Sequence, residues 1–138
     1  MTQTLAIRRV SEYLGCEGWS IIYQDFPGGR RSGVGRVARI NSALERIYNK
    51  IPDILAVKDA TLLLTEVDAS FDEKCEEKFR VWEEKIGLLL EELTIIMQYP
   101  VRDFRFGFAY YGRKHSKHIL PSDITTFRIS PEGKVIPE

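Results

Sequence analysis

Three acidic side chains flank two apolar stretches in the middle of the sequence. Asp53 precedes the stretch Ile54–Val57, and Glu66 and Asp68 lie at the end of the stretch Thr61–Val67. Only a short loop separates the two stretches, which indicates an antiparallel hairpin. In such a hairpin the Cβ atoms of Asp53 and Glu66 lie about 5 Å apart if the residues face each other, or about 7 Å apart on the diagonal. Alternation along the strand places Asp68 on the same face as Glu66.

Carboxylates that share one face of a hairpin repel one another unless a cation lies among them. Their oxygens are hard ligands, which favour Mg²⁺ or Mn²⁺. A strand that is apolar for several positions and then acidic on the same face departs from the pattern of a core strand, and such departures are expected at functional sites. The sequence therefore predicts a site for Mg²⁺ or Mn²⁺ formed by Asp53, Glu66 and Asp68.

Two structural explanations of these acids stay open. Asp53 follows a proline and could serve only as a turn residue at the start of a strand. Glu66 and Asp68 could form a solvated strand end that leads to a helix N-terminus, where acidic residues are favoured.

The rest of the chain predicts the elements that position these acids. In chain order we expect a helix over Thr4–Leu14, a strand over Trp19–Gln24, a helix over Val37–Tyr48, the hairpin, one long helix, a strand over Phe104–Tyr110 and an edge hairpin within 124–136. The long helix is expected to begin at a capping box formed by Ser70 and Glu73 and to carry one apolar stripe as far as Ile96.

This order of elements predicts an α/β fold. The hairpin strands must be antiparallel, and a long helix before the next strand suits a crossover connection. We therefore expect a mixed β-sheet flanked by helices, in one domain that spans residues 1–138.

Composition excludes several classes of protein. The 20 basic residues balance 20 acidic ones, so the net charge gives no signature of a nucleic-acid or membrane partner. No apolar run is long enough to span a membrane, and the N-terminus lacks the apolar segment of a signal peptide. Cys16 and Cys75 form no CxxC pair and are expected to be free thiols in a reducing cytoplasm. The glycine motifs GxxxxGK[ST] and GxGxxG are absent, and no organic cofactor is expected.

Two stretches without acidic residues, 26–44 and 104–122, are the expected contacts for a polyanion. Arginine and lysine side chains in them would contact DNA phosphates. The alternative is that both segments are solvated loops. The residues expected to bind nucleic acid are Arg30, Arg31, Arg36, Arg113 and Lys114.

The acids of the hairpin also resemble a known motif. Pro52-Asp53 opens one strand, and Glu66-Val67-Asp68 ends the next after twelve intervening residues. This pattern resembles the PD-(D/E)XK nuclease superfamily, in which Pro-Asp opens a strand and acid-x-Lys closes the following one. The expected elements also resemble the core of that restriction-endonuclease-like fold, whose order is α-β-β-β-α-β. The resemblance covers about Thr4 to Tyr111.

The resemblance implies a Mg²⁺- or Mn²⁺-dependent DNA endonuclease that hydrolyses phosphodiester bonds. Asp53 and Glu66 would hold the metal, with the main-chain carbonyl of Val67 as a further ligand. Asp68 would position or deprotonate the attacking water, or bind a second ion. Small proteins of this fold commonly act as dimers, so a homodimer with DNA as its partner is expected.

Asp68 departs from the superfamily pattern, because it stands where that pattern has lysine. The nearest replacements are Lys74 and Lys78, which lie one turn apart early in the predicted long helix. Either ammonium would stabilise the negative charge of the transition state.

Two other functions are left open by the missing lysine. The chain could be a catalytically inactive nuclease fold that binds nucleic acid or a protein partner. It could also be a small α/β interaction module with no role on nucleic acid.

Overall fold

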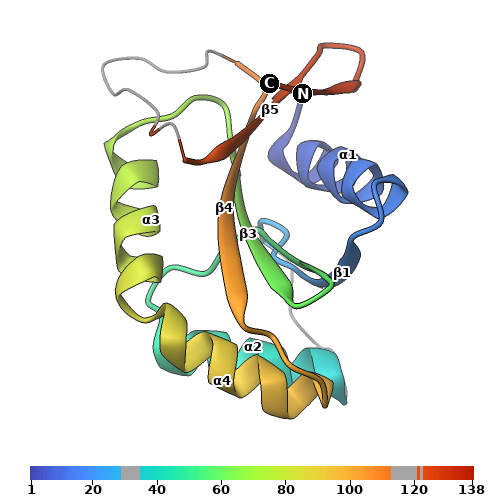
Figure 1. Ribbon diagram of the computed structural model, residues 1–138. Helices are drawn as coiled ribbons and strands as arrows, with labels where there is room; N and C mark the ends of the chain where they lie inside the picture. Colours follow the sequence, from blue (N-terminus) through green and yellow to red (C-terminus); the bar gives the residue numbers. More distant parts are fainter. Residues whose placement is uncertain (29–34, 113–120, 122) are drawn as a thin grey trace.

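The structure is a computed structural model that describes residues 1–28, 35–112, 121 and 123–138 (Figure 1). The helices are α1 (Gln3–Cys16), α2 (Arg36–Ile47), α3 (Glu73–Glu84) and α4 (Ile86–Met97). The strands are β1 (Ser20–Gln24), β2 (Ile54–Lys58), β3 (Thr61–Asp68), β4 (Asp103–Tyr110), β5 (Thr125–Ile129) and β6 (Val135–Pro137). None of the helices in these ranges combines the length and apolar character needed to cross a membrane.

The strands form one mixed sheet in the order of the sequence. β1, β2 and β3 make an antiparallel meander. β3, β4 and β5 run parallel, and β6 returns antiparallel to β5 as the predicted edge hairpin. α3 and α4 together form the crossover from β3 to β4 (Figure 1). The predicted α/β class, a mixed sheet flanked by helices, is therefore confirmed.

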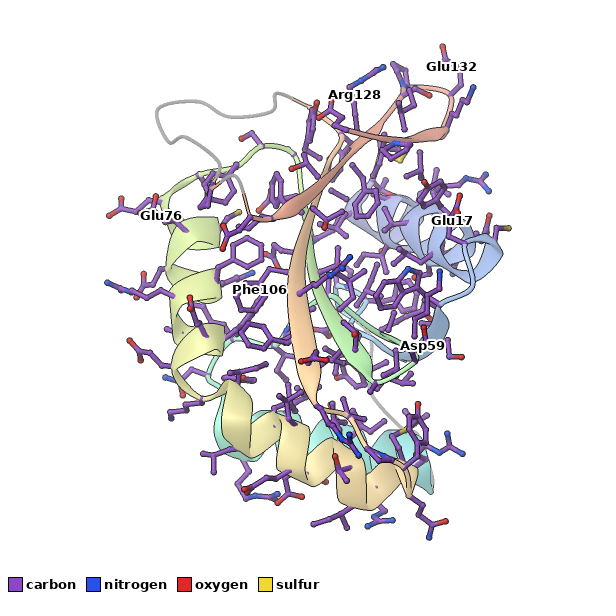
Figure 2. The ribbon with its side chains drawn as sticks, viewed as in Figure 1. Glu17, Asp59, Glu76, Phe106, Arg128 and Glu132 are labelled. Carbon is purple, nitrogen blue, oxygen red and sulfur yellow. The ribbon has the colours of Figure 1, made fainter. Side chains whose placement is uncertain are left out.

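Helices cover both faces of the sheet. α1 packs on one face through residues such as Val10 and Leu14. The other face is covered by α2, α3 and α4, and Phe106 points from β4 toward α3 there (Figure 2). Glu66 lies on this second face, in line with the buried side chains of Leu62 and Leu64. The acidic end of β3 is thus enclosed between the sheet and α3.

The register of the β2–β3 hairpin brings Asp53 beside Glu66, as the sequence predicts. Ile54 pairs with Thr65, and the N–H of Asp53 donates to the carbonyl of Thr65 at 3.1 Å. The strands are joined by a two-residue turn whose first residue, Asp59, has a φ of 55°. Aspartate tolerates this left-handed conformation better than most residues, so the turn favours this register.

The prediction of one long helix after the hairpin is wrong, because two helices meet at Lys85. α3 lies along the sheet, whereas α4 turns away and packs against α2 (Figure 1). Lys85 donates from Nζ to the carbonyl of Ile47 at 3.3 Å, and the Tyr48 hydroxyl donates to the carbonyl of Trp82 at 2.9 Å. These bonds tie the corner between α3 and α4 to the end of α2. Gly87, close to this corner, lowers the helix propensity there.

The predicted capping box is also wrong. Asp72, not Ser70, is the N-cap of α3, and its carboxylate accepts a hydrogen bond from the N–H of Cys75 at 3.0 Å. Serine and aspartate cap helices equally well, so the spacing alone did not distinguish them. The cap orients the first turns of α3 above the acids of the hairpin.

Candidate metal site

The structure brings the three predicted acids together at one end of the β2–β3 hairpin. Glu66 and Asp68 approach each other on the face that α3 covers. The carboxyl of Asp53 lies within hydrogen-bonding reach of Glu66. The N–H of Val67 fixes it there by donating to Oδ2 of Asp53 at 2.8 Å. The predicted cluster of acids is therefore confirmed.

Glu66 is the most buried acid of the cluster, with 1% of its surface exposed against 6% for Asp53. Its Oε2 accepts a hydrogen bond from the ammonium of Lys78. Its Oε1 is buried and meets no N–H or O–H donor within the part of the chain that the structure describes. A buried acceptor left without a donor costs about 1–3 kcal/mol, so this oxygen requires a proton or a cation.

The pKa values of both buried acids are raised. Burial is the largest cause for each, and the nearby charge of Asp53 adds to it for Glu66, whose pKa lies well above its ordinary value. The N–H of Val67 opposes the rise in the pKa of Asp53. Two carboxylates in one buried site therefore hold a proton more tightly than two separate ones.

Lys78, rather than Lys74, supplies the cation of this site. Burial alone would lower the pKa of Lys78, but the charges of Glu66 and Asp53 more than offset it and the pKa is raised. The ammonium therefore stays protonated at neutral pH. Lys74 is exposed, and its charge acts on Asp72 at the helix N-cap.

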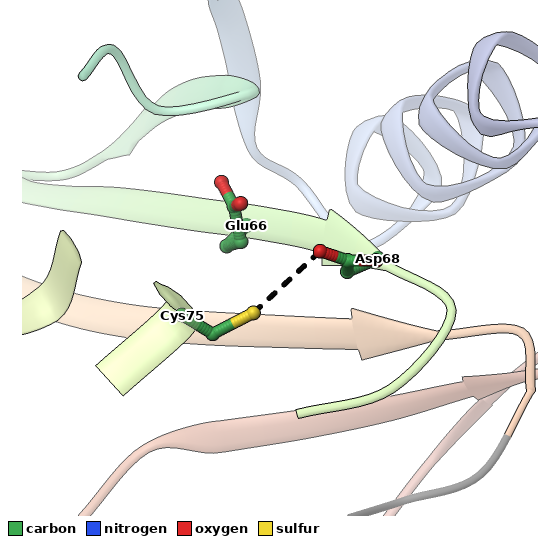
Figure 3. Close-up of side chains that lie close together, drawn as sticks. All are labelled: Glu66, Asp68 and Cys75. Carbon is green, nitrogen blue, oxygen red and sulfur yellow. Dashed lines mark hydrogen bonds between the residues drawn. The ribbon is translucent and has the colours of Figure 1, made fainter. Parts of the chain in front are cut away.

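The structure adds the thiol of Cys75 to the site. The sequence indicates only that Cys75 is a free cysteine in the apolar stripe of the predicted helix. The Sγ atom of Cys75 donates to Oδ2 of Asp68 at 3.6 Å (Figure 3). One ligand atom from each of Glu66, Asp68 and Cys75 lies within 4.8 Å of the other two. The available signal was the i, i+3 spacing of Cys75 and Lys78, which places both on one side of α3.

The carbonyl of Val67, expected to be a further metal ligand, already has a partner. Gln3 on α1 donates to it from Nε2 at 3.0 Å. This bond ties the end of β3 to α1, on the face of the sheet opposite the acids. Because a carbonyl oxygen has two lone pairs, this bond leaves the expected role of Val67 as a prediction, beside the side-chain oxygens.

The expected nucleic-acid contacts are placed only in part. Arg36 begins α2, and its guanidinium contacts Sδ of Met97 at 3.8 Å. Met97 ends α4 shortly before β4 begins, whereas Glu66 lies near the opposite end of the parallel strand β3. The structure therefore does not bring Arg36 to the acids. Four of the expected contacts lie outside the described residues: Arg30, Arg31, Arg113 and Lys114.

This set of donors fits a divalent cation. One ammonium serves two buried carboxylates, one oxygen of Glu66 has no donor, and half-buried Asp68 adds a third carboxylate. A hard divalent ion bound to Asp53 and Glu66 would offset the excess negative charge.

A scan of protein-family models finds none that matches the sequence. A search of curated proteins finds no match either.

Proposed function

We propose that this chain is a metal-dependent DNA endonuclease with a restriction-endonuclease-like fold. Apart from the additional helices α2 and α4, its order α1, β1, β2, β3, α3, β4 agrees with the core that the PD-(D/E)XK resemblance implies. A three-stranded meander followed by a parallel fourth strand supports the same assignment. Asp53 at the start of β2 and Glu66 near the end of β3 correspond to the acids of the motif. Cleavage of both strands of a duplex needs two such sites, so we also propose a homodimer.

The buried, unpartnered oxygen of Glu66 beside Asp53 is the observation that carries this proposal. The oxygens of a buried acid kept only for stability are expected to be matched by donors. Replacing a buried ionic group by apolar residues is often neutral or stabilising, so such a group is poorly explained by stability alone. Acids whose pKa values are strongly shifted and that share one charged partner are typical of functional sites.

In the proposed site Asp53 and Glu66 hold Mg²⁺ or Mn²⁺, which when bound supplies positive charge to the scissile phosphate and acidifies a water molecule. Lys78 orients Glu66, and its ammonium offsets the negative charge that develops on the phosphate. The half-buried carboxylate of Asp68 accepts the proton of the attacking water or binds a second ion. The basic segments that carry Arg30 and Arg113 remain the predicted contacts to the DNA backbone.

Cleavage of supercoiled plasmid, branched DNA and single-stranded DNA tests the proposal. We expect the wild-type chain to cut at least one of them with Mg²⁺ or Mn²⁺ and none after chelation. Glu66→Gln should lower the rate about 100-fold or more. Glu12→Gln is a matched control, because Glu12 is exposed on α1 and pairs with Arg9. Equal cleavage by wild type and Glu66→Gln would contradict the proposed site.

Binding without cleavage is the second candidate function, and the position of Asp68 favours it. This acid stands where the superfamily pattern has lysine, and it already accepts hydrogen bonds from the N–H of Ala69 and from Cys75. A binding protein would retain DNA in a salt-dependent manner without metal-dependent cleavage. Failure to retain DNA at any salt concentration would favour an interaction module instead.

A further inference from the structure

We propose that Cys75, Asp68 and Glu66 also form a site for a zinc-class divalent ion. The inference rests in part on the proposed function, because Glu66 would serve both ions. Cys75 has no place in the magnesium chemistry proposed above, since Mg²⁺ prefers oxygen ligands. Sulfur instead favours softer ions, of which Zn²⁺, Co²⁺ and Cd²⁺ are the relevant class.

The spacing of the thiol and the carboxylate agrees with zinc geometry. Zn–S and Zn–O bonds of about 2.3 and 2.0 Å at a tetrahedral angle place the two ligand atoms about 3.5 Å apart. The observed separation of Sγ of Cys75 and Oδ2 of Asp68 is 3.6 Å (Figure 3). A carboxylate oxygen of Glu66 lies within 4.8 Å of both other ligand atoms. Zinc sites that keep one coordination position open have three protein ligands.

A second observation is the buried oxygen of Glu66 that meets no donor, which requires a proton or a cation. The carboxyl is 99% buried, and Oε1 meets no donor among the residues that the structure places. Cys75 is 1% exposed, so an ion would enter beside Asp68, which is half-buried.

Binding would exchange the thiol proton for the metal. The S–H bond of Cys75 breaks, a metal–sulfur bond forms, and the proton passes to bulk water. The hydrogen bond from Cys75 to Asp68 is lost in the same exchange, which leaves Oδ2 of Asp68 available to the ion. Because Zn²⁺ and Mg²⁺ would share Glu66, each is expected to displace the other.

Titration of the metal-free full chain with Co²⁺ tests the site. We expect a sulfur-to-cobalt charge-transfer band in the near ultraviolet, reversed by Zn²⁺. Cys75→Ser should abolish the band. Cys16→Ser is the matched control and should keep it, because Cys16 is an exposed thiol at the end of α1. Absence of the band in wild type, or its loss in Cys16→Ser alone, would overturn the proposal.

A second variant keeps the test independent of the folding of Cys75→Ser. Asp68→Asn retains the thiol and should weaken Co²⁺ binding at least about tenfold. Unchanged affinity in Asp68→Asn would also overturn the proposed site. Plasmid cleavage by wild type with Mg²⁺ is measured separately. A cobalt band without cleavage supports this inference and counts against the proposed nuclease, whereas cleavage without a band does the reverse.

Discussion

Asp53 and Glu66 share one half-buried cation, Lys78, and this excess of negative charge affects stability. Their pKa values in the folded protein lie above the ordinary values of 3.8 and 4.5. The folded state therefore binds protons more tightly than the unfolded chain. The resulting stabilisation is complete only below these ordinary values and is lost as the pH rises through the raised values.

Asp53→Asn is consequently expected to stabilise the metal-free protein at pH 7–8. It removes one buried charge and keeps an oxygen for the N–H of Val67. Because burial of the charged carboxylate is what raises the pKa of Asp53, the free energy of unfolding should rise when that charge is removed. Thermal unfolding across a pH series should show this advantage shrinking toward pH 4. Exposed Asp103→Asn serves as the control, and a less stable Asp53→Asn at neutral pH would contradict the interpretation.

Lys78→Ala is expected to lower metal-dependent cleavage about 100-fold, because the ammonium beside Glu66 is lost. Arg80→Ala removes an exposed cation from the same helix and should retain activity. Circular dichroism of each variant separates lost catalysis from lost folding. A larger loss in Lys74→Ala than in Lys78→Ala would assign the role to the other lysine.

The sequence predicted the part of the site whose residues lie close together within one hairpin. Hairpin register alone placed Asp53 beside Glu66, and period-two alternation added Asp68. The choice between Lys74 and Lys78 depended on where α3 begins. Cys75 was missed because a buried cysteine in an apolar stripe is usually a core residue, and only the docking of α3 brings its thiol to Asp68.

At the scale of elements, two glycines should respond in opposite directions to alanine. A Cβ at Gly107 in β4 would lie 2.8 Å from Oγ1 of buried Thr65, whereas one at Gly87 meets nothing within 4 Å. We expect Gly107→Ala to destabilise by about 1–3 kcal/mol. Gly87→Ala, inside α4, should stabilise by about 0.5–1 kcal/mol through helix propensity. Denaturant unfolding of both variants checks this, and tolerance of Gly107→Ala would mean that β3 and β4 can separate.

The strands were predictable because alternation and turn residues are local signals, and the hairpin turn at Asp59 fixes its own register. The corner at Lys85 was not predictable, because the same apolar stripe continues from α3 into α4. Contacts with the end of α2 decide where the helix breaks, and these join residues far apart in the sequence. The restriction-endonuclease-like assignment stays a prediction.

Across the whole molecule, ion binding should appear as a change in global stability. Because an ion that binds only the folded state adds RT ln(1 + [L]/Kd), Mg²⁺ or Mn²⁺ at 100 times Kd should add about 2.7 kcal/mol. We expect the Tm of wild type to rise with either ion and that of Asp53→Asn to rise much less. Thermal melts with NaCl matched for ionic strength provide the control. Equal shifts in both proteins would indicate that the ions bind elsewhere.

The two-residue turn between β2 and β3 also bears on the order in which the protein folds. Contacts between residues close in sequence form early, whereas the parallel pairing of β3 with β4 waits for α3 and α4 to cross over. We therefore expect Asp53 and Glu66 to meet while water still surrounds them, and the later docking of α3 to remove that water and bring Lys78 to Glu66. We expect an ion to be captured during this late closure of the chain, when its ligands are still hydrated and within reach.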